Sequence, residues 1–306
     1  MELLYLLEKL RMPVLNECML LITRFGEETA FLAVALLVFW CVDKRRGYYI
    51  MTVGFIGTMA NQFLKLHFRV PRPWVLDPDF TILEQAREAA AGYSFPSGHS
   101  QNAVGTFGAL ANTAVNPWVK GVCIAIAVLV PFSRMYIGVH TPADVLVGAG
   151  LALILVGTLK KPVLKGRNHT MKALIGLMLA MAVGLLLYVE FWNFPGDMDG
   201  HNLNSGIKNA YTMLGSLVGV AIVYLAERRF VNFDTKAVWW AQILKAVLGL
   251  ALVLAVKEGL RSPLEALCGV GGTYTARAIR YFLVVVTAGL LWPVTFRWFG
   301  KLGGEK

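Results

Sequence analysis

The sequence predicts an all-α, polytopic integral membrane protein. Hydrophobic residues make up 57% of the 306-residue chain, charged residues only 16%, and the mean hydropathy is +0.58. Several apolar runs reach the roughly 17–25 residues that a helix needs to cross a bilayer. Because hydrocarbon offers no hydrogen-bond partners, the backbone must be helical wherever lipid surrounds it.

Nine membrane spans are expected, each an apolar run bounded by charged or turn-forming residues. They fall near residues 29–43, 47–66, 98–116, 118–139, 142–159, 172–193, 208–226, 238–257 and 275–296. Residues 1–26 form a further amphipathic helix that contains Pro13. This helix either crosses the membrane as a tenth span or lies on it. The first residues do not show the charged, apolar and cleavage regions of a signal peptide.

Basic residues gather in four clusters, and alternating spans place all four on one side of the membrane. The clusters are Lys44-Arg45-Arg46; Lys160, Lys161, Lys165, Arg167 and Lys172; Arg228-Arg229; and Arg297, Lys301 and Lys306. The positive-inside rule makes this side cytoplasmic. The other side receives loop 67–96, the region around His140 and the acidic loop 195–204. The net charge of +10 is therefore a topology signal, and no nucleic-acid partner is expected.

The four cysteines do not form a metal or disulfide pattern. Three lie in apolar runs, and none has C-x-x-C spacing. They are Cys18, Cys41, Cys123 and Cys268. We expect them to be small core residues, and we expect neither a metal nor another cofactor.

Three stretches place costly polar groups at ends of spans on the outer side. They are KLHFRVPRP with Lys65, Arg72 and Pro73; PSGH with Ser97, Gly98 and His99; and SRMYIGVHTPAD with Ser133, Arg134, His140 and Asp144. Each stretch alone has an ordinary structural explanation. Lys65 and Arg72 could reach to the headgroups, and Ser97 could be a helix N-cap. Residues 141–144 fit a capping box with proline at the first helical position.

Together, the three stretches supply what phosphoryl transfer requires. Lysine and arginine can hold phosphate oxygens, and a helix start at Ser97 offers backbone N–H donors. One histidine can attack phosphorus while another protonates the leaving oxygen. Asp144 follows His140 by four residues, so a helix beginning there places both on one face. A carboxylate on one ring nitrogen fixes the tautomer of the nucleophile.

At this point the chain resembles the type 2 phosphatidic acid phosphatase superfamily, integral-membrane lipid phosphatases related to vanadium haloperoxidases. The family pattern is K-x6-R-P, then P-S-G-H, then S-R-x5-H-x3-D, and every spacing matches here. The resemblance covers residues 1–160 and implies a six-helix phosphatase core. Residues 161–306 then add about four transmembrane helices.

The resemblance implies a role for each matching residue. His140 is the nucleophile that forms a phosphohistidine, Asp144 orients it, and His99 is the general acid and then the base for water. The phosphate is held by Lys65, Arg72, Ser97, Gly98 and Arg134. Members of this family typically need no metal. His67 lies near the site in sequence, whereas His169 and His201 lack a motif.

The implied reaction is metal-independent hydrolysis of a lipid phosphate or pyrophosphate reached from the bilayer. Candidate substrates are phosphatidate, phosphatidylglycerol phosphate, a sphingoid-base phosphate and a polyprenyl pyrophosphate. The resemblance favours a bacterial plasma membrane, with the site on the extracytoplasmic side. One alternative is a sugar-phosphate phosphatase of the glucose-6-phosphatase type. Another is a non-catalytic lipid-binding or transport protein, which the complete motif set disfavours.

Two regions have no role fixed by a motif. Loop 67–96 carries Trp74, Asp77 and Asp79, and we expect it to form part of a lid. The helices of residues 161–306 are expected to pack, to shape the substrate site or to form a homodimer. A transport role is the less favoured interpretation of their charged residues, which include Glu190, Lys245, Lys257, Glu258, Arg277 and Arg280.

Overall fold

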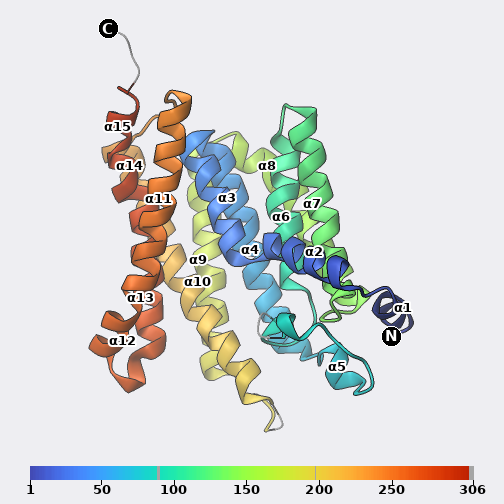
Figure 1. Cartoon of the computed structure of the whole chain (residues 1–306). Helices are drawn as coiled ribbons and strands as arrows, with labels where there is room; N and C mark the ends of the chain where they lie inside the picture. Colours follow the sequence, from blue (N-terminus) through green and yellow to red (C-terminus); the bar gives the residue numbers. More distant parts are fainter. Residues whose placement is uncertain (88–89, 197, 303–306) are drawn as a thin grey trace. The chain divides into compact units, whose positions relative to one another are not determined.

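The computed structural model describes residues 1–87, 90–196 and 198–302, and every regular element in these ranges is helical (Figure 1). The α-helices are α1 (Glu2–Lys9), α2 (Pro13–Thr23), α3 (Glu28–Cys41), α4 (Lys44–Phe68), α5 (Pro73–Leu76), α6 (Gly98–Thr113), α7 (Pro117–Tyr136), α8 (Pro142–Leu164), α9 (Asn168–Phe191), α10 (Gly200–Ala226), α11 (Trp239–Gly259), α12 (Arg261–Cys268), α13 (Thr273–Val286), α14 (Trp292–Val294) and α15 (Phe296–Phe299). Short 3-10 or π turns are η1 (Arg24–Gly26), η2 (Glu84–Ala86), η4 (Glu227–Val231), η5 (Val270–Gly272) and η6 (Thr287–Leu291). Lys306 and parts of loops 67–96 and 195–204 lie outside the described residues.

The all-α membrane fold is confirmed. Six helical segments among the described residues are long and apolar enough to cross a membrane: Pro117–Tyr136, Pro142–Leu164, Asn168–Phe191, Gly200–Val231, Trp239–Cys268 and Thr273–Phe299. The last four are the additional helices expected after residue 160. Each of the other three predicted spans also contains a helix. However, α3 and α6 have only 14 and 16 residues, and α4 carries polar residues such as Asn61 and Lys65.

The N-terminal segment is two short helices rather than the one expected. Pro13 is the first helical residue of α2, and α1 ends at Lys9, so the chain breaks between them. With 8 and 11 residues, these helices are about 12 and 16 Å long, too short to cross a bilayer. In Figure 1, α2 lies across α6 and α7 instead of running along them.

The chain folds into two compact units that alternate along the sequence. The first, here called the core unit, contains residues 1–34, 49–165 and 194–206. The second unit contains residues 35–48, 166–193 and the chain from residue 207 onward. The expected functional division between residues 1–160 and 161–306 stays a prediction.

Close helix packing in the core unit brings the polar stretches to one end. α6 packs against both α7 and α8. Gly148 of α8 allows this approach, because a Cβ there would lie 2.4 Å from the Ser97 carbonyl oxygen. The start of α6 and the start of α8 are therefore neighbours, which places the PSGH stretch beside His140.

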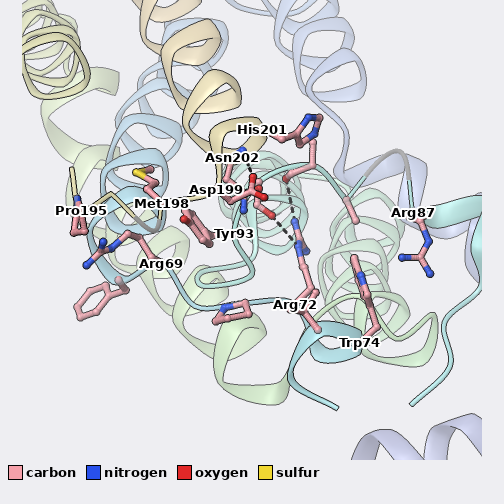
Figure 2. Close-up of a pocket in the computed structure, with 16 residues that line it drawn as sticks. Arg69, Arg72, Trp74, Arg87, Tyr93, Pro195, Met198, Asp199, His201 and Asn202 are labelled. Atoms are coloured by element: carbon pink, nitrogen blue, oxygen red, sulfur yellow. Dashed lines mark hydrogen bonds between the residues drawn. The ribbon is translucent and has the colours of Figure 1, made fainter. Parts of the chain in front are cut away.

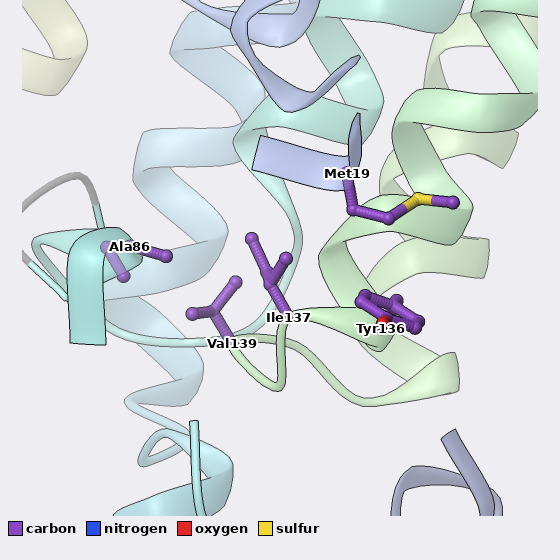
Figure 3. Packing of buried hydrophobic residues seen from close by; sticks show 6 residues of the cluster. Met19, Ala86, Tyr136, Ile137 and Val139 are labelled. Atoms are coloured by element: carbon purple, nitrogen blue, oxygen red, sulfur yellow. The ribbon is translucent and has the colours of Figure 1, made fainter. Parts of the chain in front are cut away.

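A small apolar cluster fixes the loops around these helix starts (Figure 3). Met19 of α2, Ala86 of η2 and three residues at the end of α7 and in the turn after it are buried against one another. These three residues are Tyr136, the last residue of α7, and Ile137 and Val139 of the turn. Burial of such side chains is the main source of stability in a fold, so the cluster holds the turn before His140 in place.

The second unit buries several polar groups that are paired with one another or with the backbone. Lys44 and Glu227 form an ion pair of 2.7 Å, and the Trp40 indole donates to the Ala288 carbonyl at 2.8 Å. Lys245, the most deeply placed charge of the predicted spans, keeps its ammonium group inside the protein. It is fully buried, donates to the Thr235 carbonyl at 2.9 Å and lies 4.6 Å from the centre of the Phe296 ring.

Candidate active site

The three polar stretches meet in the core unit. Lys65 lies in the last turn of α4, Arg72 precedes α5, and Ser97 caps α6. Arg134 lies in the last turn of α7, and His140 and Asp144 flank the start of α8. Six of the eight predicted site residues are less than a tenth exposed: Lys65, Arg72, Ser97, Arg134, His140 and Asp144. Gly98 and His99 are half-buried at the start of α6.

The Arg72–His140 contact defines the tautomer of the imidazole. Arg72 Nη1 lies 2.9 Å from His140 Nε2. A guanidinium can only donate hydrogen bonds, so Nε2 accepts and its lone pair is not protonated. The imidazole proton is then on Nδ1, which faces Asp144 Oδ2 at 3.4 Å. This is the tautomer that a nucleophilic Nε2 requires.

Asp144 is held by three donors around one oxygen. Its Oδ2 accepts from the Thr141 backbone N–H at 2.7 Å and from the Ser94 hydroxyl at 2.6 Å, in addition to its contact with His140. The Asp144 backbone N–H donates to the Thr141 hydroxyl oxygen at 3.3 Å, which completes the capping box. Asp144 therefore both caps α8 and orients the imidazole. Ser94 belongs to none of the three motifs. The only sign of its role in the sequence is its position two residues before P-S-G-H.

Burial and neighbouring cations keep His140 neutral. Burial lowers the pKa of His140 well below its ordinary 6.5, and the charges of Arg72, Arg134 and Lys65 lower it further. Burial also lowers the pKa of Arg72, to about 10, while Asp144 opposes this shift. Arg72 thus remains a cation at neutral pH, next to an imidazole that remains uncharged.

The start of α6 lies beside Asp144. The Ser97 hydroxyl accepts from the Ser100 N–H as the N-cap, and the Ser97 N–H donates to the Asp144 carbonyl at 2.9 Å. Gly98 is uncrowded, since a Cβ there would meet nothing nearer than Asn61 Oδ1 at 3.7 Å. His99 Nε2 is buried and has no hydrogen-bond partner among the described residues. Buried polar atoms without partners are rare and mark positions where a ligand can bind.

Lys65 and Arg134 are the other two cations of the predicted phosphate site. Lys65 Nζ donates to the carbonyls of Tyr93 and Ser94. Arg134 Nη1 donates to the Thr23 hydroxyl at 2.8 Å, while its Nε and Nη2 are buried without a partner among the described residues. Thr23 ends α2, so the N-terminal segment positions a site residue, which sequence analysis did not anticipate.

A pocket of about 1000 Å³ opens beside Arg72 (Figure 2). Its walls come from the end of α4, from α5, from the segment before α6 and from the start of α10, all within the core unit. His201, which sequence analysis left without a role, lines this pocket. His67 does not line it and instead stacks on Phe63. Among the described residues, no group of three or more His, Cys, Asp or Glu side chains could hold a metal ion.

Comparison with known proteins identifies the family. Residues 45–164 match the model of the PAP2 superfamily, and residues 211–305 match that of the PAP2 superfamily phosphatase, transmembrane extension. The chain belongs to the PAP2 superfamily and is an integral membrane phosphatase with multiple spans, which confirms the resemblance.

Three curated relatives each match about half of the chain. Phosphatidylglycerophosphatase B of Bacillus subtilis is 34% identical over 161 residues, which cover 48% of this chain and 74% of the relative. Undecaprenyl-diphosphatase of Sulfolobus acidocaldarius is 29% identical over 152 residues, with coverages of 48% and 70%. Undecaprenyl-diphosphatase BcrC of Bacillus subtilis is 29% identical over 150 residues, with coverages of 48% and 73%. No solved structure gives a significant match.

Proposed function

We propose that this protein hydrolyses a lipid phosphate or pyrophosphate through a phosphohistidine at His140. The observation that carries the proposal is the chain of contacts from Arg72 through His140 to Asp144, with His99 Nε2 buried and without a partner in the part of the chain that the structure describes. These are a nucleophile of defined tautomer, its orienting carboxylate and a second histidine for proton transfer. The relatives that act on phosphatidylglycerophosphate and undecaprenyl diphosphate favour a substrate with a lipid tail.

The first step transfers the phosphoryl group to the enzyme. The lone pair of His140 Nε2 attacks phosphorus, and the bond between phosphorus and the leaving oxygen breaks. Protonated His99 gives its proton to that oxygen, so the product leaves as an alcohol or as a lipid phosphate. Asp144 holds the proton on Nδ1 and stabilises the positive charge that develops on the ring.

The second step restores the enzyme. His99, now neutral, removes a proton from water, whose oxygen attacks the phosphohistidine. The bond between phosphorus and Nε2 breaks, inorganic phosphate leaves and His140 returns to its neutral form. In both steps Lys65, Arg72, Arg134 and the N–H groups near Ser97 and Gly98 stabilise charge on the phosphoryl oxygens. Arg72 exchanges its bond to Nε2 for one to phosphate when substrate binds.

The orientation of the site is part of the proposal. The basic clusters at residues 44–46, 160–172 and 228–229 predict a cytoplasmic face at the ends of the spans opposite to His140. We therefore place the site on the extracytoplasmic side of a plasma membrane, where a lipid headgroup can enter it from the bilayer.

Phosphate release from a panel of lipid phosphates, with glucose 6-phosphate included, tests the proposal. The purified protein is assayed in EDTA as wild type and as His140→Ala. We expect wild-type release from at least one lipid phosphate and a loss of more than about 1000-fold in the variant. Absence of release from every lipid phosphate would contradict the proposed substrate class. Loss of wild-type activity in EDTA would contradict metal independence.

A further inference from the structure

We infer that the pocket beside Arg72 holds a second phosphate of the substrate, carried by the leaving group and bound by Arg69. The inference rests on the proposed function, and it narrows the substrate class to lipids with two phosphates. Arg72 belongs both to the catalytic contacts and to the wall of this pocket. We place the part of the substrate that is attached to the phosphate at His140 in this pocket.

The pocket has an excess of positive charge. Its described lining includes three arginines, Arg69, Arg72 and Arg87, but a single carboxylate, Asp199. That carboxylate already has a hydrogen-bond partner, because Asp199 Oδ1 accepts from the Asn202 backbone N–H at 2.8 Å. An anion is the ligand that this charge distribution favours, and arginine binds phosphate through paired hydrogen bonds.

Of the three arginines, Arg69 is the one available to a ligand. Arg72 donates to the carbonyls of Ala91, Gly92 and Val139 as well as to His140. Arg87 forms two bonds with the Glu84 carboxylate, at 2.7 and 2.8 Å. The Arg69 guanidinium makes no hydrogen bond or ion pair with any residue that the structure describes.

The backbone holds Arg69 in an uncommon conformation. Its φ is 51°, in the left-handed region that residues with long side chains rarely adopt. The residues on either side fix it there, since the Arg69 N–H donates to the Lys65 carbonyl and the Val70 carbonyl accepts from the Ser94 N–H. Such conformations cluster at ligand sites, where the surrounding structure maintains them.

The wall beside Arg69 lies outside the two regions that the family models match. In Figure 2, Arg69 lies on the same side of the pocket as Pro195 and Met198, whereas Trp74 and Arg87 lie on the opposite side. Residues 195–202 fall between the two regions that match the family models, 45–164 and 211–305. The pocket therefore combines the shared catalytic residues with a wall that the family models do not cover.

The chemistry predicts which lipids this pocket distinguishes. A polyprenyl pyrophosphate carries its second phosphate directly next to the first, and phosphatidylglycerol phosphate carries it across a glycerol. Either could place an anion at Arg69. Phosphatidate has one phosphate and would leave Arg69 without a partner, so it is expected to be the poorer substrate.

The test compares these three lipids in wild type and in Arg69→Gly. Glycine adopts a positive φ without strain, so the variant removes the cation and not the backbone conformation. Arg69→Gln is a second variant that keeps a polar side chain. Asn232→Gly is the matched control, because Asn232 also has a positive φ, 38°, and lies in the second unit.

We expect wild type to prefer a two-phosphate lipid over phosphatidate by about 10- to 100-fold in kcat/KM. Both Arg69 variants should remove most of that preference, mainly by raising KM for the two-phosphate lipid. Their kcat/KM for phosphatidate should stay within about twofold of wild type, and so should all values of the Asn232→Gly protein. Each preparation is judged by the ratio of its kcat/KM values for two lipids. A smaller fraction of folded protein lowers both values equally and leaves this ratio unchanged. An effect on one two-phosphate lipid alone also supports the inference and gives the spacing of the phosphates.

Two results overturn the inference while leaving the proposed function intact. One is an active wild type without preference for two-phosphate lipids. The other is a preference that Arg69→Gly and Arg69→Gln do not change. If wild type hydrolyses none of the lipids, the proposed function fails and the inference fails with it.

Discussion

Arg72 Nη1 donates a hydrogen bond to His140 Nε2 over 2.9 Å, in a site where both side chains are buried. A cation thus lies on the atom that we propose as the nucleophile. This arrangement fixes the proton on Nδ1 and keeps the imidazole neutral before substrate arrives. When a phosphate enters, its oxygens are better acceptors than the ring, so Arg72 can move to them and free the lone pair.

Arg72→Lys should therefore be a severe change despite the retained charge. A lysine cannot donate to the Ala91, Gly92 and Val139 carbonyls and to a phosphate with the same planar geometry. We expect kcat/KM to fall by about 100-fold or more. Phosphate release measures it, with exposed Arg297→Lys as the control. Activity within about threefold of wild type would argue against a geometric role for the guanidinium.

Ser94→Ala tests the residue that orients Asp144. The variant removes the 2.6 Å hydrogen bond to Asp144 Oδ2 without adding volume. We expect kcat to fall by about 10-fold, with little change in KM, because Ser94 acts through Asp144 and His140. Ser216→Ala, at a buried serine of the second unit, is the control and should keep wild-type kcat. An unchanged kcat in Ser94→Ala would show that the other two contacts of Asp144 suffice.

Thr23→Val tests the link between the N-terminal segment and the site. Valine has a similar shape but leaves Arg134 Nη1 without its acceptor in a buried position. We expect a loss of about 1–3 kcal/mol in unfolding free energy, together with a higher KM for the substrate. Thermal unfolding in detergent and steady-state kinetics measure the two effects. Equal stability of the variant and wild type would contradict the importance of this contact.

The pH dependence follows from the lowered pKa of His140. Protonation of the imidazole abolishes its nucleophilicity, and a pKa well below 6.5 postpones this loss to more acidic pH. We expect the acid limb of phosphoenzyme formation to lie below pH 6.5 for an aryl phosphate, whose leaving group needs no general acid. The unfolded chain binds a proton at His140 near pH 6.5 and the folded chain does not, so stability should decline as pH falls below 6.5. An acid limb at or above pH 6.5 would contradict the neutral, buried imidazole.

Sequence was a good guide where a motif and an apolar run determine the structure. The K-x6-R-P, P-S-G-H and S-R-x5-H-x3-D residues lie together at one end of the core unit, and the capping box at Thr141–Asp144 is present. The capping box follows from a local signal, since fixed spacing at a helix start places side chains without reference to the rest of the chain. The meeting of the three motifs was expected because each lies at the end of a predicted span on the same side of the membrane.

Sequence was a poor guide where contacts join distant segments. Ser94 and Thr23 have no motif, and their importance depends on reaching Asp144 and Arg134 across 50 and 111 residues. The pocket wall that includes Pro195, Met198 and His201 was expected only to be part of an acidic outer loop, because nothing in its composition shows that it packs with the core unit. The N-terminal helix was expected to be continuous, but Pro13 begins a new helix instead.

We propose that His140 carries the phosphoryl group, and trapping the phosphohistidine is the most direct experiment on this step. Wild type, His140→Asn and His99→Asn are mixed with a labelled aryl phosphate, quenched in alkali because phosphohistidine is labile in acid, and digested for mass spectrometry. We expect phosphate on residue 140 in wild type and none there in His140→Asn. His99→Asn should hold more phosphate than wild type, because hydrolysis of the intermediate is slowed. Phosphate on another residue, or full turnover by His140→Asn, would contradict it.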